Sequence, residues 1–239
     1  GQTLERWPAC RFSRDTSRPV SRIPGVATGP TTWVPSKIMQ LPKSIRENLR
    51  FLSVEVDSQV ANLQTYLRAP STVVGKRILD RGGYAYNLKM RIHNSSLNQL
   101  ARCKKGGADT LTLRGVEFIA TDLERIAELC RDCIKQMEYL TDIECLRPKA
   151  LRAMLERVRL AIHMVEPAIQ ANDTGLALKI GQTEAKLDRD YNKLFKRYIG
   201  ALKQKKKTEP LISAMFVAHN VEQMGDALLD ISESVISAN

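Results

Sequence analysis

Three pairs of acidic residues are the best candidates for chemistry in this sequence, because the two members of each pair stand four positions apart. The pairs are Glu124 with Glu128, Glu184 with Asp188, and Glu222 with Asp226. Residues four apart lie on one face of a helix, one turn from each other. Carboxylate oxygens bind hard and borderline cations, so the pairs predict a cation site, to which His219 would add a nitrogen ligand. The alternative is that basic neighbours such as Arg125, Lys186 and Arg189 neutralise acids on solvated helix faces.

The acid pairs belong to a segment that occurs twice. Phe118–Lys135 and Phe216–Glu233 align with Glu222 on Glu124, 98 positions earlier. Both copies carry two acids four residues apart beside an apolar stripe of helical period. Most of the chain is therefore read as two copies of one unit. If the helix with Glu184 packs against the last helix, four carboxylates converge in the second copy, where they would repel one another unless a cation or basic side chain relieves them.

Apolar residues recur every three or four positions along six stretches, which predicts six helices. The first ends at Pro70, and the second is interrupted at Gly82-Gly83, where we expect a bend or a close helix contact. The fourth contains Pro167, which is expected to kink it. Residues 172–174 cap the fifth, and the sixth is expected from about Leu211 to Ser237.

The chain divides into three parts. Residues 1–38 are rich in proline and arginine, which predicts an irregular arm. Either the arm has no function, with Met39 as the natural start, or it tethers the protein to an acidic surface. Residues 39–140 and 141–239 are the two repeats, so the predicted fold is all-α, with two tandem three-helix bundles.

Composition narrows the class of protein. Hydrophobic residues make up 43% and aromatic residues 5% of the chain, which favours helices over a β-sandwich. The sequence has no apolar run of the roughly 20 residues that cross a bilayer, so we expect a soluble protein. Its five scattered cysteines favour reduced thiols and a cytoplasmic location. The formal net charge of +11 is consistent with an acidic protein, an anionic membrane face or nucleic acid as partner.

Two lysine-rich loops occupy equivalent places in the two repeats. Their lysines are Lys104, Lys105, Lys203, Lys205, Lys206 and Lys207. Since both loops join the second and third helices of a repeat, we expect them to project from the same end of their bundles. They are either a solvated surface or an electropositive end that docks an acidic protein or an anionic membrane. Nucleic acid is disfavoured, because the basic residues are not interleaved with aromatic ones.

The remaining candidates predict structural roles. Cys130 and Cys133 form a C-x-x-C spacing, but the sequence has no second pair to complete a zinc site, and both cysteines fall on an apolar helix stripe. They are therefore predicted to pack in the core. His93 and His163 have no acidic stripe beside them on their own helices and are expected to be ordinary helix residues. No nucleotide-binding loop or hydrolase motif occurs, so the chain is not predicted to be an enzyme.

The acid-bearing segments resemble a known family. TDLERIAEL and HNVEQMGDALLDISE are similar to the repeated E-x-x-x-D signature of PhoU proteins, and KLDRDYNKL resembles that family's segment on the second helix. The resemblance implies two three-helix bundles and a cytoplasmic, homodimeric regulator of phosphate uptake and phosphate-starvation signalling. It also implies contact with the ATPase subunit of a phosphate ABC transporter and with a sensor histidine kinase, with peripheral membrane association through the transporter. By position, it assigns Glu124, Glu128, Asp188, Glu222 and Asp226 as ligands of a multinuclear iron or zinc cluster.

The chain departs from the family pattern mainly in its first half. Ala127-Glu128 replaces the usual Gly-Asp, and Gly82, Tyr84 and Tyr86 stand where acids are frequent. Asn192 replaces a frequent glutamate in the second half. A metal site is therefore expected in the second half rather than the first. The alternative to a PhoU-like regulator is a basic helical adaptor that binds nucleic acid or another acidic partner.

Overall fold

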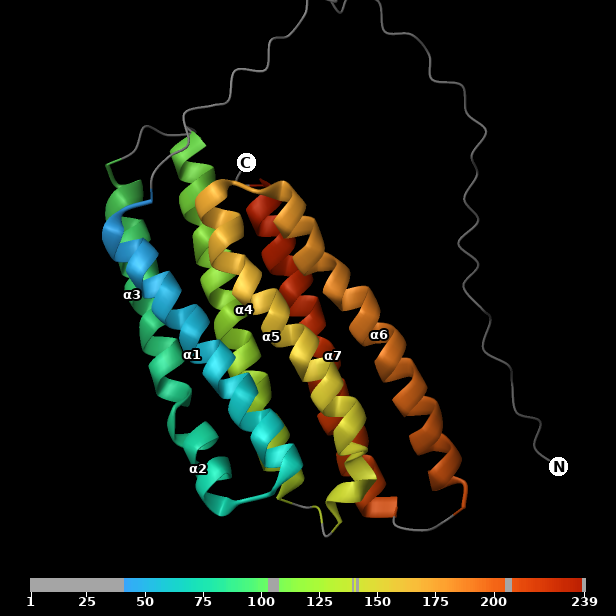
Figure 1. Ribbon diagram of the computed structural model, residues 1–239. Helices are drawn as coiled ribbons and strands as arrows, with labels where there is room; N and C mark the ends of the chain where they lie inside the picture. The colour runs from blue at the N-terminus through green and yellow to red at the C-terminus, as the bar shows by residue number, and fades with distance from the viewer. Residues whose placement is uncertain (1–40, 103–107, 139, 141, 205–207, 238–239) are drawn as a thin grey trace, which may run out of the picture. The chain divides into compact units, whose positions relative to one another are not determined.

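The computed structural model describes residues 41–102, 108–138, 140, 142–204 and 208–237, and its regular elements are all helical (Figure 1). They are α1 (Lys43–Arg68), α2 (Thr72–Asp80), α3 (Gly82–Leu100), α4 (Ala108–Met137), the 3₁₀ helix η1 (Ile143–Leu146), α5 (Pro148–Ala171), α6 (Thr174–Leu202) and α7 (Thr208–Ser237). The all-α prediction is confirmed. The predicted arm, residues 1–38, lies outside the described residues. No described helix is long and apolar enough to cross a membrane.

The helices form where the apolar period and the caps predicted them. In α1 the stripe Val56, Val60 and Leu63 is fully buried. The Asp173 carboxylate accepts a hydrogen bond from the Leu176 amide at 3.0 Å and so caps the start of α6, as predicted. Pro167 lies inside α5 but does not end it, because the helix continues to Ala171.

The middle helix of the first repeat is broken into α2 and α3. Arg81 separates the two segments, and α3 begins at Gly82, so the predicted interruption lies next to the glycine pair. The Arg81 guanidinium donates two hydrogen bonds to the buried Glu55 carboxylate of α1, at 2.9 and 2.5 Å. Gln59 donates a third to the same carboxylate at 2.8 Å. Because these contacts compensate the buried charge of Glu55, they hold the break against α1.

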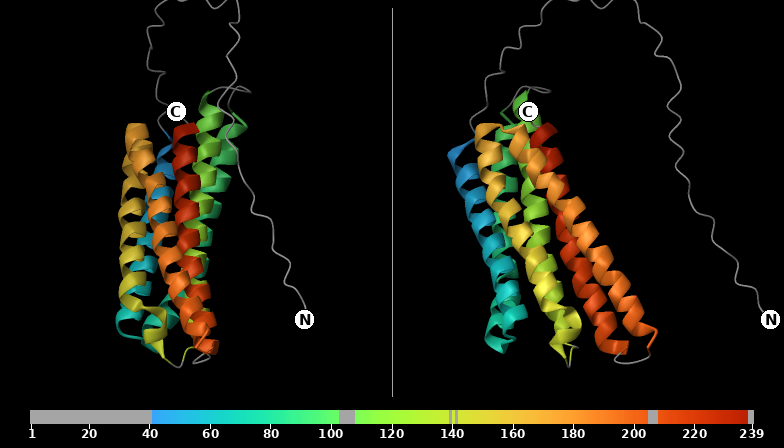
Figure 2. Two further views of the ribbon diagram at one scale, coloured as in Figure 1. Left: turned by 90° about the vertical axis from the view of Figure 1, so that its right-hand side faces the viewer. Right: turned by 45° about the vertical axis from the view of Figure 1, so that its right-hand side comes forward.

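The two repeats pack through matching helices. α4 lies against α7 and α1 lies against α5, and each pair is antiparallel (Figures 1 and 2). Cys133, near the end of α4, reaches the Val217 carbonyl, near the start of α7, at 3.8 Å. Arg159 of α5 donates to the Asp57 carboxylate of α1 at 2.8 and 3.2 Å. The repeats are therefore related by a local two-fold relationship along the α4–α7 contact.

This arrangement corrects the expectation of a single electropositive end. The end of α3 and the start of α4 lie at one end of the helical unit, and the end of α6 and the start of α7 lie at the other (Figure 1). Equivalent helix ends therefore lie at opposite ends of the helical unit, because antiparallel packing reverses the second repeat. Lys203, the exposed C-cap of α6, is the only one of the six predicted docking lysines among the described residues; Lys104, Lys105, Lys205, Lys206 and Lys207 lie outside them.

The C-x-x-C pair lies in the core, as predicted. Cys130 and Cys133 are fully buried on α4 among apolar residues. Burial raises the pKa of both thiols, so both are protonated at neutral pH. The pair packs as small apolar side chains rather than as a metal site or a reactive thiol pair.

Candidate functional site

The predicted convergence of α6 and α7 is present, and a glycine makes it possible. A β-carbon at Gly225 would lie 3.3 Å from the backbone Cα of Glu184 and 3.0 Å from Leu187 Cδ1. Because Gly225 lacks that atom, the two helices approach closely enough to bring the acids of α6 beside those of α7 (Figures 1 and 2). The second-repeat acid cluster therefore comprises Glu184 and Asp188 on α6 and Glu222 and Asp226 on α7.

The acids of the second-repeat acid cluster are close enough to repel one another electrostatically. Burial raises the pKa of Glu184, and the nearby charges of Asp188, Asp226 and Glu222 raise it further. Within the described ranges, none of the four carboxylates has a lysine or arginine within ion-pair distance. Lys186 and Arg189, which the alternative named as neutralising neighbours, form no ion pair with the cluster in the described part of the chain. Among those residues, the four acids share one helix contact without a lysine or arginine partner.

Instead of lysine or arginine, amide and imidazole groups contact the carboxylates of this cluster. The Gln223 amide donates to Asp226 at 2.7 Å and to Glu222 at 3.3 Å, and its oxygen accepts from the Arg125 guanidinium of α4 at 2.9 Å. His219 Nδ1 lies 3.2 Å from Glu222 Oε2. On α6, Asn192 donates to Asp188 at 2.9 Å. Each acid except Glu184 is thus held by a neutral or weakly basic neighbour.

This geometry does not fit a metal cluster as it stands. Among the described residues, no three histidine, cysteine, aspartate or glutamate side chains come together closely enough to hold a metal ion. Amide N–H groups already donate hydrogen bonds to carboxylate oxygens of Asp188, Glu222 and Asp226. A cation could bind these oxygens only if the amide side chains moved away. The arrangement orients carboxylates on one surface, but it does not form a coordination sphere.

The first-repeat acids are paired with basic residues that sequence patterns did not reveal. Glu124 is buried, and Lys89 of α3 donates to it at 2.8 Å while lying over the Tyr86 ring at 4.8 Å. Glu128 is half-exposed and accepts from Arg131 at 3.1 Å. Each member of this predicted ligand pair has a basic partner of its own. The two carboxylates form separate ion pairs rather than one site.

The Arg131 side chain fills the place where the second repeat has an acid. A β-carbon at Gly82 would lie 2.2 Å from the Arg131 guanidinium, so the arginine lies directly over the glycine backbone. Gly82 is 102 positions before Glu184, and Tyr86 has the same relationship to Asp188. The missing acids on α3 were visible in the sequence. The basic side chains that replace them were not, because their positions follow no repeat.

Two histidines that were expected to be ordinary have carboxylate partners on neighbouring helices. His93 of α3 lies 3.3 Å from Glu117 of α4, and His163 of α5 lies 3.1 Å from Asp57 of α1. Arg159 and His163 lower the pKa of Asp57 and outweigh burial, which raises it. Sequence reasoning missed these pairs because it examined only acids on the same helix.

A separate acidic groove lies between α4 and α7. It has a volume of about 470 Å³, and its lining includes Phe118, Asp122, Asp230 and Glu233. Burial raises the pKa of Asp122 to about 6, with a further contribution from the charge of Asp230. Arg125, which lies 3.7 Å from Asp230, lowers it only in part. Two acids from equivalent helices thus face each other near the contact between the repeats.

Together these features define a class: an all-α protein of two three-helix repeats, whose third helices pack together and each carry an acid pair. Residues 151–235 match the family model described as "PhoU domain". Over 203 residues the chain is 19% identical to the "Phosphate-specific transport system accessory protein PhoU" of Escherichia coli strain K12, covering 81% of each chain. It is 28% identical over 120 residues to the corresponding homolog of Xylella fastidiosa strain 9a5c, covering 49% of this chain and 51% of the other.

Solved structures agree on the fold. A crystal structure of PhoU from Pseudomonas aeruginosa superposes with a TM-score of 0.72 at 17% identity, covering 81% of this chain and 94% of that one. The phosphate transport system regulatory protein PhoU from Streptococcus pneumoniae gives a TM-score of 0.71 at 16% identity, covering 81% and 92%. The chain therefore resembles PhoU proteins in the domain matched over residues 151–235 and in its fold.

Proposed function

We propose that this protein is an accessory regulator of phosphate transport that acts by binding other proteins. The observation that carries the proposal is the acid pair at equivalent positions of α4 and α7, within the fold shared with PhoU proteins. Relatives along 81% of the chain are named as phosphate-specific transport accessory proteins, which describes regulation rather than catalysis. The proposed partners are the ATPase subunit of a phosphate ABC transporter and its sensor histidine kinase, in the cytoplasm, with a homodimer as the proposed assembly.

We propose that the second repeat is the half that binds the partner protein. Its acid cluster has no lysine or arginine partner among the described residues, whereas Lys89 and Arg131 pair with the first-repeat acids. Carboxylates without a lysine or arginine partner bind cations or basic partner residues more readily than those whose charges are already compensated. We therefore assign the recognition of a partner to Glu184, Glu222 and Asp226, and a structural role to Glu124.

A deletion strain complemented with variants tests this function. Loss of the protein should derepress a phosphate-starvation reporter in high phosphate, and the wild-type gene should restore repression. Glu222→Ala with Asp226→Ala should fail to restore it, while Glu128→Ala with Asp132→Ala, two half-exposed acids of α4 with the same four-residue spacing, should succeed. Normal repression in the deletion strain would contradict the proposal.

An iron or zinc cluster is a separate question for the same acids. Elemental analysis of the purified protein, with Glu222→Ala and Asp226→Ala as controls, decides it. Stoichiometric metal that disappears in both variants would show that the side chains rearrange around a metal. Metal-free protein that still represses the reporter would show that regulation needs no cluster.

A further inference from the structure

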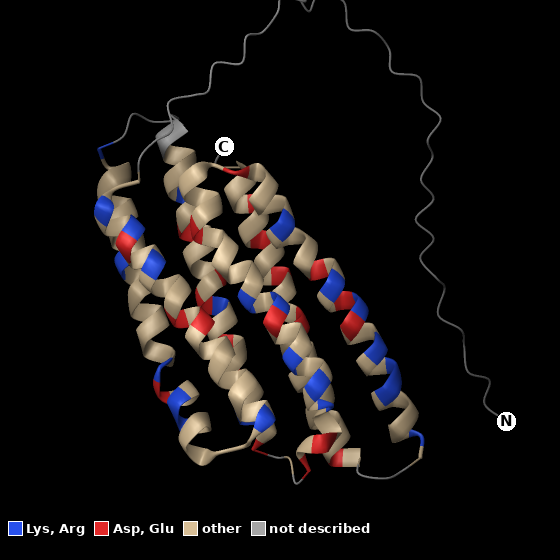
Figure 3. Cartoon of the chain, viewed as in Figure 1, with Lys and Arg blue, Asp and Glu red and all other residues tan. Residues whose placement is uncertain are grey.

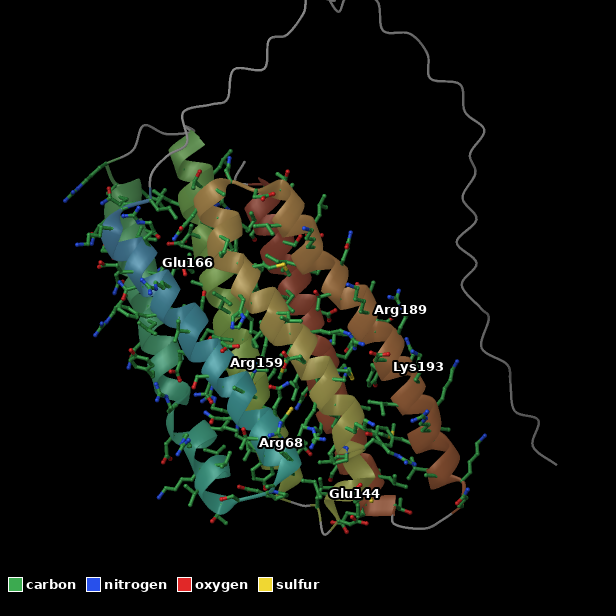
Figure 4. The ribbon with its side chains drawn as sticks, in the orientation of Figure 1. Arg68, Glu144, Arg159, Glu166, Arg189 and Lys193 are labelled. Atoms are coloured by element: carbon green, nitrogen blue, oxygen red, sulfur yellow. The ribbon has the colours of Figure 1, made fainter. Side chains whose placement is uncertain are left out.

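The exposed side of α6 carries a row of cations. Its members are separated by three, four or seven positions and are all exposed: Lys179, Lys186, Arg189, Lys193, Lys196 and Lys203. At 1.5 Å per residue, the row is about 36 Å long. Blue segments recur along α6 in Figure 3, with red segments between some of them, and Arg189 and Lys193 extend away from the other helices in Figure 4. We call these six residues the α6 basic row.

The α6 basic row is not a requirement of the fold. The helices equivalent to α6 in the first repeat are α2 and α3, 102 positions earlier, and they have Tyr84, Asn87 and Asn94 where α6 has Lys186, Arg189 and Lys196. Arg77 and Arg91 match Lys179 and Lys193, so four of the six positions have no basic counterpart. The complete row is therefore a feature of the second repeat.

A groove between α5 and α6 adjoins the row. It has a volume of about 250 Å³, with Leu160, Ala161 and Met164 on the α5 side and Lys179 and Lys186 on the α6 side. Arg157 is a third cation in its lining, and no carboxylate lines it. Leu160 is 55% exposed, so the groove presents an apolar side chain beside its cations.

The charges along this surface are mostly uncompensated. Asp190 pairs with Arg157 and with Lys193, the latter at 3.1 Å. In the part of the chain that the structure describes, no carboxylate lies within ion-pair distance of Lys179, Lys186, Arg189 or Lys196. An apolar strip bordered by free cations complements a ligand that is apolar along one edge and acidic along the other.

We propose that the α6 basic row and the adjoining groove dock an acidic amphipathic helix of a partner protein. Such a helix would place its apolar edge over Leu160 and its carboxylates against Lys179 and Lys186, in the helix-in-groove mode. A flat bilayer would meet the convex row but would not fill the groove. Nucleic acid would meet no aromatic side chain for base stacking among the row residues.

The inference deepens the proposed function, because it names the surface and partner chemistry of a regulator that acts by protein contact. The two can fail separately. Peptide binding measures the surface without reference to phosphate, and the reporter measures regulation without reference to this surface.

The test uses the full chain and a fluorescent designed helix of about 21 residues, with leucines on one face and glutamates on its flanks. Anisotropy should show binding that weakens with salt. Lys179→Glu with Lys186→Glu should weaken it about tenfold or more. The control, Arg77→Glu on α2 with Arg91→Glu on α3, makes the same change in net charge at positions equivalent to Lys179 and Lys193, and should leave binding unchanged. A peptide with its leucines replaced by serine should also bind more weakly.

Three results would overturn the proposal: equal losses in both double variants, no loss in the groove variant, or no peptide binding at low salt. Vesicles containing phosphatidylglycerol and a DNA duplex serve as competitors. If either binds more tightly than the peptide and depends on Lys179 and Lys186, the surface has a different occupant from the one proposed.

Discussion

The Arg125 guanidinium donates a hydrogen bond to the Gln223 amide oxygen at 2.9 Å, and these two residues occupy the same position in the two repeats. The other end of the Gln223 amide binds Glu222 and Asp226. A side chain of the first repeat therefore orients the acids of the second. The repeats carry separate sequences, but the candidate site depends on both.

Replacing Asp122 with asparagine should stabilise the protein at neutral pH. The folded-state pKa of about 6 lies above the ordinary value of 3.8, so between these pH values the folded protein holds more protons than the unfolded chain. Stability from this group falls as pH rises through that window and stays low above it. We expect a gain of about 1 to 2 kcal/mol at pH 7.5, reduced from the full conversion of the shift because Asp122 is partly exposed.

Urea unfolding at pH 4 and pH 7.5 checks this expectation, since the gain should disappear at pH 4. The second repeat has Asn220 at the equivalent position, which shows that the fold accepts the substitution. Asp132→Asn is the control, because Asp132 is half-exposed and paired with Lys135 at 2.8 Å. A gain that is equal at both pH values would show that repulsion at Asp122 is not the cause.

Removing the charge of Lys89 should destabilise the first repeat. Lys89→Met leaves the buried Glu124 carboxylate without its ion-pair partner, at an expected cost of about 2 to 4 kcal/mol. The double variant Lys89→Met with Glu124→Gln should recover most of that loss, because no unpaired charge remains. Denaturant unfolding of the single and double variants measures the coupling.

Lys135→Met is the matched control for Lys89→Met. Lys135 pairs with Asp132 at a similar distance, but both side chains are about half-exposed, so the change should stay within about 0.5 kcal/mol. Equal losses at Lys89 and Lys135 would mean that burial of Glu124 does not set the cost.

Gly225→Ala should destabilise the contact between α6 and α7. Alanine favours a helix over glycine by about 1 kcal/mol, but the new methyl group would lie 3.3 Å from the α6 backbone at Glu184. Because backbone cannot turn away as a side chain can, we expect a net loss of about 1 to 3 kcal/mol. Gly200→Ala, on α6 with nothing within 4 Å of its β-carbon, should instead show a gain. Thermal unfolding of both variants gives the comparison, and a stabilised Gly225→Ala would refute close packing here.

Neutralising Glu184 separates repulsion from metal binding. In protein treated with a chelator, Glu184→Gln should raise the free energy of unfolding by a few tenths of a kcal/mol at low salt, roughly the scale of surface charge interactions. High salt should abolish that gain. In a protein that had bound metal through these acids, the same variant would lose metal and stability. The sign of the effect with and without chelator therefore distinguishes the two.

The helical fold could be predicted from the sequence because the apolar residues of each helix recur at a regular spacing. The stripe containing Val56 and Val60 predicted α1, and the two alignments predicted which acids would meet at α6 and α7. The partners of those acids were not periodic. Lys89 reaches Glu124 from another helix, and Arg131 folds over Gly82, and neither contact follows from spacing along one helix. Side-chain direction across a helix contact depends on packing, which a single sequence does not display.

The sequence pattern also did not predict that the two repeats pack in an antiparallel orientation. The equivalent sequence positions of the two loops predicted that both would project from the same end of the bundles. The local two-fold relationship instead places the end of α6 and the start of α7 opposite the end of α3 and the start of α4. Repeats in sequence establish that two units share a fold, but the contact between the units determines which surfaces face together.

Because Gly225 has no side chain, the backbone of α7 lies close to the backbone of α6 at Glu184. Glu184 is two residues before Lys186 of the α6 basic row. α6 therefore has carboxylates on the side that meets α7 and cations on its exposed side. Opposite charges lie on two sides of one helix, so α6 presents a complementary side to a basic and to an acidic ligand alike.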